Sequence, residues 1–176
     1  SFRAALRHDA RHVGALVNLS AALLAKGQTE GALAAAAQAV QIDGRAAATH
    51  NALGDVLLKF ARHEGAAECF ESALARDAAH LDARIGLSSA LKELGQVGRA
   101  EALLREVVAM KPDHAAALNS LGVLLEQRGD VAAAAAAFRA AIAANARFAN
   151  AWYQLAQLKG VQLSEHEVEA IETFQR

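Results

Sequence analysis

The sequence predicts an all-α protein built from repeated helix pairs, and three observations support this prediction. Only one proline occurs in the 176 residues, so little in the chain breaks a helix. Hydrophobic residues make up 54% of the chain but aromatic residues only 5%, so the core must consist mainly of alanine and leucine, which are good helix formers. Finally, leucine recurs with a period of 34 residues, the length of one helix–turn–helix unit.

The period is visible at several positions of the unit. A leucine, each time followed by a small residue, stands at Leu19, Leu53, Leu87, Leu121 and Leu155. Further along, an alanine recurs and another apolar residue follows it four positions later: Ala32 and Ala36, Ala66 and Phe70, Ala100 and Leu104, Ala134 and Phe138. Between the two clusters lies a turn, where glycine suits the positive φ that ends a helix: Gly27, Gly95 and Gly129, with Ala61 in the remaining repeat.

This frame divides the chain into six segments. Complete repeats are expected over residues 13–46, 47–80, 81–114 and 115–148. Residues 1–12 are interpreted as the second helix of a truncated repeat, because Phe2, Ala5 and Asp9 precede Ala36, Ala39 and Asp43 by one period. Residues 149–176 are interpreted as a divergent final repeat with a capping or linker helix.

The six consecutive alanines between Val131 and Phe138 are predicted to form a packed helix, not a flexible linker. Gly129 ends the preceding helix, and Asp130 can cap the next one by accepting hydrogen bonds from its first backbone N–H groups. The frame places three residues on the buried stripe of this helix: Ala134, Phe138 and Ala141. Three other alanines are expected to point outward or sideways: Ala133, Ala136 and Ala140.

Residues 151–176 begin as a repeat with Trp152 and Leu155 and then leave the frame, since Val168 stands where a small residue is expected. Ser164 and Glu167 form an S-x-x-E capping box that opens a further helix. Its apolar face and its acidic face are predicted to consist of Val168, Ile171 and Phe174, and of Glu165, Glu169 and Glu172. A helix of this kind can close the open end of a stack of repeats.

These residues resemble the tetratricopeptide repeat, whose signature has Leu-Gly in the first helix and Ala-x3-Phe in the second. The best matches are Leu53-Gly54 with Ala66 and Phe70, and Leu121-Gly122 with Ala134 and Phe138. Only Pro112 occupies the closing proline position of the family. The resemblance implies a right-handed superhelical solenoid of stacked helix pairs, with a concave groove that holds segments of partner proteins.

The groove positions of the family project onto polar residues of mixed charge. They are Asn51, Asp55 and Lys59 in the second repeat, Asp82, Ser89 and Lys92 in the third, Asn119 and Gln127 in the fourth, and Asn150, Tyr153 and Gln157 at the end. Taken singly, each is equally typical of a solvated helix surface. Asn51 and Asn119 share one repeat position, however, and an amide side chain can both donate to and accept from a peptide backbone. The sequence therefore predicts a peptide-binding groove.

A carboxylate clamp is an alternative use of the same surface. In chaperone-type members of the family, two cations and asparagine side chains grip a C-terminal carboxylate. Lys59, Lys92 and Asn51 can supply these groups here. Asp55 and Glu93 adjoin them, however, and oppose an anionic ligand. The mixed groove is therefore the preferred interpretation.

Composition argues against several other classes of function. The net charge of −1 attracts neither nucleic acid nor an anionic membrane, and no apolar stretch approaches the roughly 20 residues that span a bilayer. Cys69, the only cysteine, is expected to be an inert packed thiol. His80 and His114 share an inter-repeat position and are interpreted as parts of the repeat, not as metal ligands. With no nucleophile motif or phosphate loop present, we expect no catalytic residue, metal or cofactor.

We therefore expect a soluble, cytoplasmic, non-catalytic interaction module that binds a protein or peptide segment. The alternative is the substrate-presenting repeat region of a two-domain bacterial sulfotransferase whose catalytic domain lies downstream. It is suggested by Trp152 to Lys159 followed by the acidic helix Glu165 to Phe174, which resemble the segment joining repeats to a sulfotransferase domain in bacterial fusion proteins. The partner's identity and the oligomeric state are not encoded in a readable motif.

Overall fold

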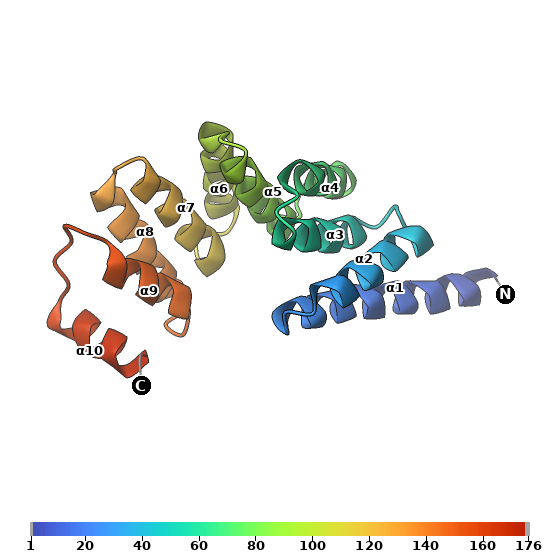
Figure 1. The fold of residues 1–176 in the computed structure, drawn as a ribbon, viewed down its shortest axis with the longest axis horizontal. Helices are drawn as coiled ribbons and strands as arrows, with labels where there is room; N and C mark the ends of the chain where they lie inside the picture. The colour runs from blue at the N-terminus through green and yellow to red at the C-terminus, as the bar shows by residue number, and fades with distance from the viewer. Residues whose placement is uncertain (1, 175–176) are drawn as a thin grey trace. The chain divides into compact units, whose positions relative to one another are not determined.

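The computed structural model describes the backbone of residues 2–174 and the side chains of residues 12–171. Within this range the secondary structure consists of α-helices alone, which confirms the all-α prediction (Figure 1). The helices are α1 Phe2–Ala25, α2 Thr29–Ile42, α3 Ala47–Lys59, α4 His63–Arg76, α5 Leu81–Glu93, α6 Val97–Met110, α7 Ala115–Gln127, α8 Val131–Ala144, α9 Ala149–Gln157 and α10 Glu165–Phe174.

The helices begin with the period that the sequence predicts. From the second complete repeat onward, the first helices start 34 residues apart, at Ala47, Leu81, Ala115 and Ala149. The second helices keep the same interval, at Thr29, His63, Val97, Val131 and Glu165. Helix α10 therefore begins in register, although the sequence interpretation has the last segment leaving the frame. The departure lies instead in α9, which is 9 residues long where α7 has 13.

The beginning of the chain differs from the prediction. Residues 1–12 were expected to form a separate helix, but α1 runs without a break from Phe2 to Ala25. The expected break falls near residues 10–12, where neither glycine nor proline stands to end a helix. The intrinsic helix propensity of Ala and Arg then favours one continuous helix. The side chains of Phe2, Ala5 and Asp9, on which the expectation rested, lie outside the described residues.

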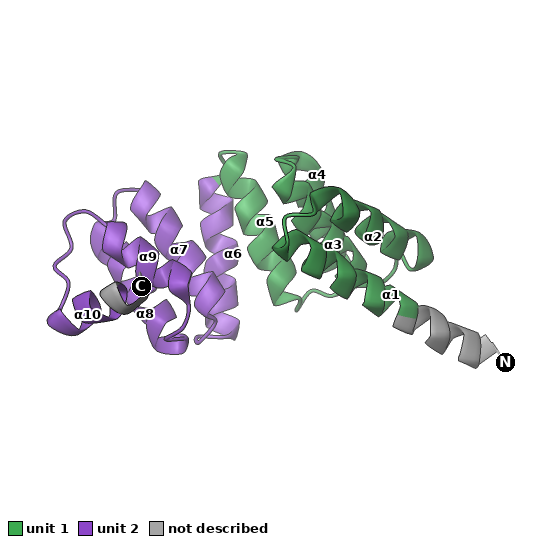
Figure 2. Cartoon of the chain, turned by 60° about the horizontal axis from the view of Figure 1, so that its bottom comes forward, with its two compact units in different colours: residues 1–96 green, residues 97–176 purple. Residues whose placement is uncertain are grey.

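The structure divides into two compact units (Figure 2). Unit 1 contains α1 to α5 and unit 2 contains α6 to α10, with the boundary between Gln96 and Val97. The predicted repeat 81–114 therefore contributes its first helix to unit 1 and its second helix to unit 2. Each unit has buried side chains of its own and is described by itself.

The core of unit 1 is organised around Phe70 of α4, which is fully buried. Its ring lies against two glycines, Gly54 of α3 and Gly86 of α5. A Cβ atom on Gly54 would lie 2.7 Å from Cε1 of Phe70, and a Cβ on Gly86 would overlap the same ring. The ring of Phe70 therefore requires glycine at position 54, the small residue after the repeated Leu53, and at position 86, directly before the repeated Leu87.

The core of unit 2 repeats this arrangement around Phe138 of α8, since a Cβ on Gly122 would lie 2.5 Å from Cε1 of its ring. The predicted stripe of the alanine run is confirmed, because Ala134, Phe138 and Ala141 are all fully buried, and Ala136 is exposed. More of the run is buried than expected, however: Ala135 and Ala137 are buried as well. Leu155 and Leu158 belong to the same cluster.

The turns and helix starts follow the local sequence. The turn glycines adopt positive φ, at +72° for Gly27, +75° for Gly95 and +81° for Gly129, and Ala61 adopts +53° at the equivalent place. Asp130 caps α8 as predicted, since its Oδ1 accepts a hydrogen bond from the N–H of Ala133 at 3.1 Å. Two further caps are histidines.

His80 and His114, the two histidines at the shared inter-repeat position, stand immediately before α5 and α7. The Nδ1 atom of His80 accepts from the N–H of Ala83 at 3.2 Å, and that of His114 accepts from the N–H of Ala117 at 3.3 Å. Both rings thus satisfy a backbone donor of the first turn, the task of an N-cap residue. A structural role explains why histidine recurs there.

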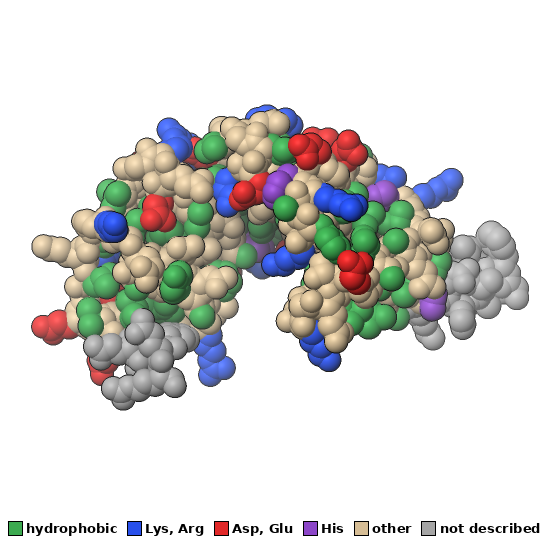
Figure 3. All heavy atoms as spheres, in the orientation of Figure 1, with side chains coloured by type: hydrophobic (Ala, Val, Ile, Leu, Met, Phe, Trp, Pro, Cys, Tyr) green, Lys and Arg blue, Asp and Glu red, His purple; other side chains and the backbone are tan. Residues whose placement is uncertain are grey.

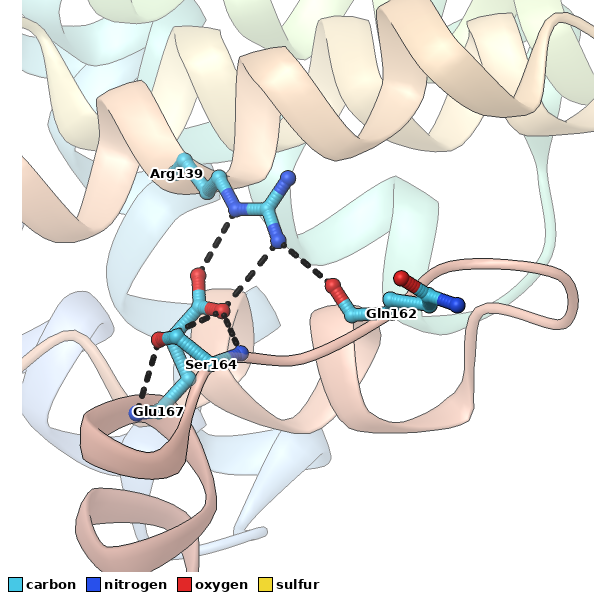
Figure 4. A network of polar contacts seen from close by, with 4 residues as sticks. All are labelled: Arg139, Gln162, Ser164 and Glu167. Atoms are coloured by element: carbon cyan, nitrogen blue, oxygen red, sulfur yellow. Dashed lines mark hydrogen bonds and ion pairs between the residues drawn. The ribbon is translucent and has the colours of Figure 1, made fainter.

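The final helix is held by a polar network on α8 (Figure 4). The predicted capping box is present: Ser164 N–H donates to Glu167 Oε2 at 2.8 Å, and Glu167 N–H donates to Ser164 Oγ at 3.3 Å. Arg139 donates to both carboxylate oxygens of Glu167, at 2.7 and 3.1 Å, and to the carbonyl of Gln162 at 3.1 Å. These bonds to Arg139, followed by those to Ser164, lower the pKa of Glu167 to about 2 against the effect of burial.

The apolar face predicted for α10 is only partly covered. Val168 is 43% exposed, so it does not pack as a cap residue should, and Ile171 is half-buried. The side chains of Glu172 and Phe174 lie outside the described residues. In the segment before α10, Val161 and Leu163 pack on the cluster around Phe138.

Candidate functional site

A hollow of about 240 Å³ lies among the first helices of unit 1. Successive turns of α1 supply one wall, and α3 and α5 supply the rest. Its lining consists of Val17, Ser20, Ala21 and Leu24 from α1, Asn51, Ala52 and Asp55 from α3, and Asp82 from α5. The spacing of three to four residues in α1 and α3 places these side chains on one face of each helix. Three of the eight lining residues are predicted groove residues.

Asn51 and Asp55 are one helical turn apart on α3 and are hydrogen-bonded to each other. The Nδ2 of Asn51 donates to Oδ2 of Asp55 at 3.1 Å. The other amide atom, Oδ1 of Asn51, is buried and accepts no hydrogen bond from the part of the chain that the structure describes. Such an unsatisfied buried oxygen is unusual in a folded protein and costs stability.

The carboxyl group of Asp55 is held in an unfavourable environment for a negative charge. Burial raises its pKa from 3.8 to about 6, and the nearby carboxylate of Asp82 contributes to this rise. The hydrogen bond from Asn51 and the charge of Lys59 act in the opposite direction but do not cancel these effects. The hollow thus carries two acidic groups, Asp55, which is half-buried, and Asp82, which is exposed.

Unit 2 contains the equivalent of Asn51 without the acidic groups. Asn119 of α7 also has a buried Oδ1 that accepts no hydrogen bond within the described residues. Two periods after Asp55 and Asp82, the chain has Val123 and Asn150. The amide is therefore repeated between the units, and the negative charge is not.

The remaining predicted site residues are not gathered into the hollow. Ser89 donates to the carbonyl of Ile85 within its own helix at 3.1 Å. Tyr153 is 64% exposed on α9. The others on exposed positions of the first helices are Lys59, Gln127, Asn150 and Gln157.

The structure does not support a carboxylate clamp. Lys92 forms an ion pair with the adjacent Glu93 at 2.8 Å, and this contact lowers the pKa of Glu93. Lys59 is exposed at the end of α3, one turn from the acidic Asp55. A negative ligand at Lys59 would lie one helical turn from the carboxyl group of Asp55. The lysines that the clamp requires are thus present, but acidic side chains lie next to them.

The α1 wall of the hollow was missed by the sequence interpretation, because its residues are apolar or small and give no signal of binding. The repeat frame itself offers a way to find them. Val17 and Ala21 precede Asn51 and Asp55 by one period and thus occupy the same groove positions in the first complete repeat. The place of a residue in the repeat, and not its polarity, thus identifies the candidate positions on α1.

The described residues show few features of other functional classes. In residues 2–174 no helix combines the length and the apolar character needed to cross a bilayer. No three side chains of His, Cys, Asp or Glu among those described are grouped as metal ligands would be. Burial and the neighbouring Glu68 raise the pKa of the Cys69 thiol, which makes it less reactive. On the face drawn in Figure 3, acidic and basic side chains are interspersed.

Comparison with known proteins identifies the repeats. A family model described as Tetratricopeptide repeat matches residues 51–92 and 87–149, which together span more than half of the chain. No curated protein sequence matches the chain.

Several solved structures share the fold. A thermophilic TPR protein of Thermus thermophilus superimposes with a TM-score of 0.80 at 20% identity, covering 92% of this chain and 87% of that protein. PilF of Pseudomonas aeruginosa gives 0.75 at 20% identity, covering 96% and 86%. YrrB, described as a TPR protein with an unusual peptide-binding site, gives 0.61 at 22% identity, covering 99% and 92%. At these identities the likeness establishes the fold.

Proposed function

Because the chain belongs to the tetratricopeptide repeat family, we propose that it is a non-catalytic interaction module that binds a segment of another protein along the first helices of its repeats. The observation that carries the proposal is the hollow among α1, α3 and α5, in which three predicted groove residues meet. A recess with a few polar groups on an otherwise apolar wall is the usual form of a binding site.

The two equivalent asparagines add a physical argument. Oδ1 of Asn51 and Oδ1 of Asn119 are both buried without a hydrogen-bond partner among the described residues. Leaving a buried acceptor unsatisfied costs about 1–3 kcal/mol. The terminal torsion of an asparagine side chain is broad, so a small rotation presents the amide to a ligand. The backbone of a bound segment can then satisfy the oxygen that the free protein leaves unpaired.

A structural neighbour points in the same direction. YrrB, which shares the fold, is described as having a peptide-binding site. This likeness supports binding of a peptide but does not specify the sequence of the ligand.

Selection from a displayed library of short random peptides tests the proposal. We expect the protein to enrich peptides with affinities near the micromolar range, about −8 kcal/mol, which is typical of small interfaces. Replacing both Asn51 and Asn119 by alanine should weaken binding of the selected peptides about tenfold or more. It should not lower the free energy of unfolding, because the replacement also removes two unsatisfied oxygens.

Asn18→Ala is the matched control, since Asn18 is exposed on α1 and does not line the hollow. It should leave binding unchanged. If the double variant binds the selected peptides as well as the natural sequence does, the binding surface lies elsewhere and the proposal is wrong.

The sulfotransferase-linked alternative stays a prediction. It rests on residues 151–176, and the family match does not extend to that segment. Reading the gene beyond Arg176 tests it, because it requires a downstream catalytic domain.

A further inference from the structure

The hollow in unit 1 has two chemically different parts. Its wall on α1 is apolar or small, with Val17, Ala21 and Leu24. Its opposite side carries the carboxyl groups of Asp55 and Asp82, from two different helices. An apolar wall that leads to a polar end matches a side chain with an apolar stem and a polar head.

The two carboxyl groups lack a cationic partner in the described structure. None of the ion pairs found among the described residues involves Asp55 or Asp82. The one cation that acts on Asp55 is Lys59, which is exposed one turn further along α3. Folded proteins rarely keep a half-buried charge beside a like charge without compensation, because both desolvation and repulsion oppose it. A bound cation removes both penalties.

The volume of the hollow suits a single side chain or a small ion. Its volume of about 240 Å³ is roughly that of eight water molecules in the liquid. The stem and head of an arginine or a lysine fit this space, whereas a second helix does not. The wall of Val17 and Leu24 gives such a stem apolar surface to cover, which a bare metal ion cannot use.

We propose that the hollow binds the side chain of an arginine or lysine in the partner segment, with its stem along α1 and its cationic head between Asp55 and Asp82. This inference rests on the proposed function and specifies the class of segment that is bound. It also sets the position of that segment, because Val123 and Asn150 replace the two acids in unit 2. The cationic residue is therefore held by unit 1.

Binding should depend on pH, since the cation favours the ionised form of Asp55. The charged groups that act on Asp55 are Asp82 from α5 and Lys59 from α3, and the lining residues of α1 are uncharged. With a pKa of about 6 in the free protein, Asp55 is largely protonated at pH 5 and ionised above pH 7. The affinity for a cationic peptide should therefore rise between these two values.

Pools of synthetic peptides provide the test. The pools share random flanking positions and differ only at one central residue, which is arginine, lysine, glutamine or glutamate. Fluorescence anisotropy of the labelled pools gives their affinities for the whole chain. We expect the arginine and lysine pools to bind at least tenfold more tightly than the glutamine pool and the glutamate pool to bind most weakly.

Charge variants connect this preference to the hollow. Asp55→Asn and Asp82→Asn should each reduce the preference for the cationic pools about tenfold, and the double variant should abolish it. Asp113→Asn is the control, because Asp113 is exposed in a loop of unit 2 and changes the net charge by the same amount. It should leave the preference unchanged.

A second pair of variants separates insertion into the hollow from attraction at long range. Ala21 and Ala22 are both exposed on α1, but only Ala21 lines the hollow. Ala21→Leu should therefore weaken binding of the cationic pools by filling the hollow, without any change of charge. The Ala22→Leu variant should bind the cationic pools with the same affinity as the natural protein.

The outcomes distinguish the inference from the proposed function. If the glutamine pool binds as tightly as the cationic pools, and Asp55→Asn has no effect, the inference is overturned while peptide binding stands. If no pool binds, both are overturned. The melting temperature of the protein is also measured with calcium ions, with putrescine and with the cationic pools. If calcium ions or putrescine raise it as much as the cationic pools do, and Asp55→Asn removes this effect, the hollow binds a free cation and the inference is overturned.

Discussion

Unit 1 and unit 2 are built on the same framework but present different chemistry. Each has a buried phenylalanine against a glycine of the preceding helix, Phe70 with Gly54 and Phe138 with Gly122. Each also keeps an asparagine whose Oδ1 is buried without a partner among the described residues. Only unit 1 adds two carboxyl groups next to that amide. The comparison teaches that the repeat fixes the scaffold, whereas substitutions on the first helices change the charge of the surface that they form.

The acidic group that only unit 1 carries also affects the stability of the fold. A raised pKa means that the ionised form of Asp55 is less favourable in the folded than in the unfolded chain. Unit 1 therefore keeps a group that lowers its stability near neutral pH, and unit 2 has Val123 in its place. A destabilising polar group on a repeated surface position is typical of a functional site.

The largest expected effect tests the shared framework. Phe70→Ala and Phe138→Ala should each lower the free energy of unfolding by about 3–5 kcal/mol, because both rings are fully buried. Urea denaturation followed by circular dichroism measures the loss. Similar values are expected for the two variants. A loss below about 1 kcal/mol at either position would contradict the equivalence of the two cores.

The next effect tests the charge difference. Asp55→Asn should raise the free energy of unfolding near pH 7 by up to about 3 kcal/mol, since the pKa of Asp55 is about 6 in the folded state against an ordinary value of 3.8 in the unfolded chain. Between these pKa values the folded state binds more protons than the unfolded state, so the natural protein loses stability as the pH rises from about 4 to about 6.

Urea denaturation at several pH values provides the check. The advantage of the variant should disappear below about pH 4, where Asp55 is protonated in both states. Val123→Asp, which introduces the acid at the equivalent position of unit 2, should destabilise. A variant Asp55→Asn that is less stable than the natural protein near pH 7 would show that the carboxylate contributes favourable contacts instead.

A smaller effect concerns the alanine stripe. Ala134→Leu, and Ala66→Leu at the same position of unit 1, should each cost about 1–3 kcal/mol, because both alanines are fully buried and a larger side chain overpacks the core. Ala136→Leu should be nearly neutral because Ala136 is exposed on the same helix. Equal urea midpoints for the variants at positions 134 and 136 would refute the stripe.

The smallest effect compares the turns within the two helix pairs. Ala61 in unit 1 adopts φ +53°, where glycine stands in unit 2 as Gly129 with φ +81°. Ala61→Gly should therefore stabilise by about 0.5–1 kcal/mol, and Gly129→Ala should destabilise by a similar amount. Thermal denaturation of the two variants measures both changes. Shifts of the same sign would mean that the turns are not equivalent.

Much of the fold could be predicted from the sequence because it is specified locally. The turn glycines, the cap at Asp130 and the capping box at Ser164 and Glu167 depend on residues close together in the chain. Their physical effects act over one or two helical turns. The predictions made from them agree with the structure.

The prediction failed where a distant segment decides the outcome. Ala135 and Ala137 are buried in a cluster that also contains Leu155 and Leu158, and Val161 and Leu163 pack against this cluster whereas Val168 is exposed. Periodicity within a helix identifies a face but not what packs on it. The continuous α1 is a different case, since its expected break rested on the repeat register and not on a local stop signal.

For the candidate site, too, some features could be predicted from the sequence and others depend on the packing of distant helices. The sequence by itself determined the repeat frame, and the resemblance to the family projected its groove positions onto Asn51, Asp55 and Asp82, which stay predicted site residues. Only the tertiary structure decided that these three side chains meet across α3 and α5, that α1 closes the hollow with apolar residues, and that the pKa of Asp55 rises. Burial and the approach of two carboxyl groups depend on helices that are far apart in the chain, so their energies are set only when the helices pack.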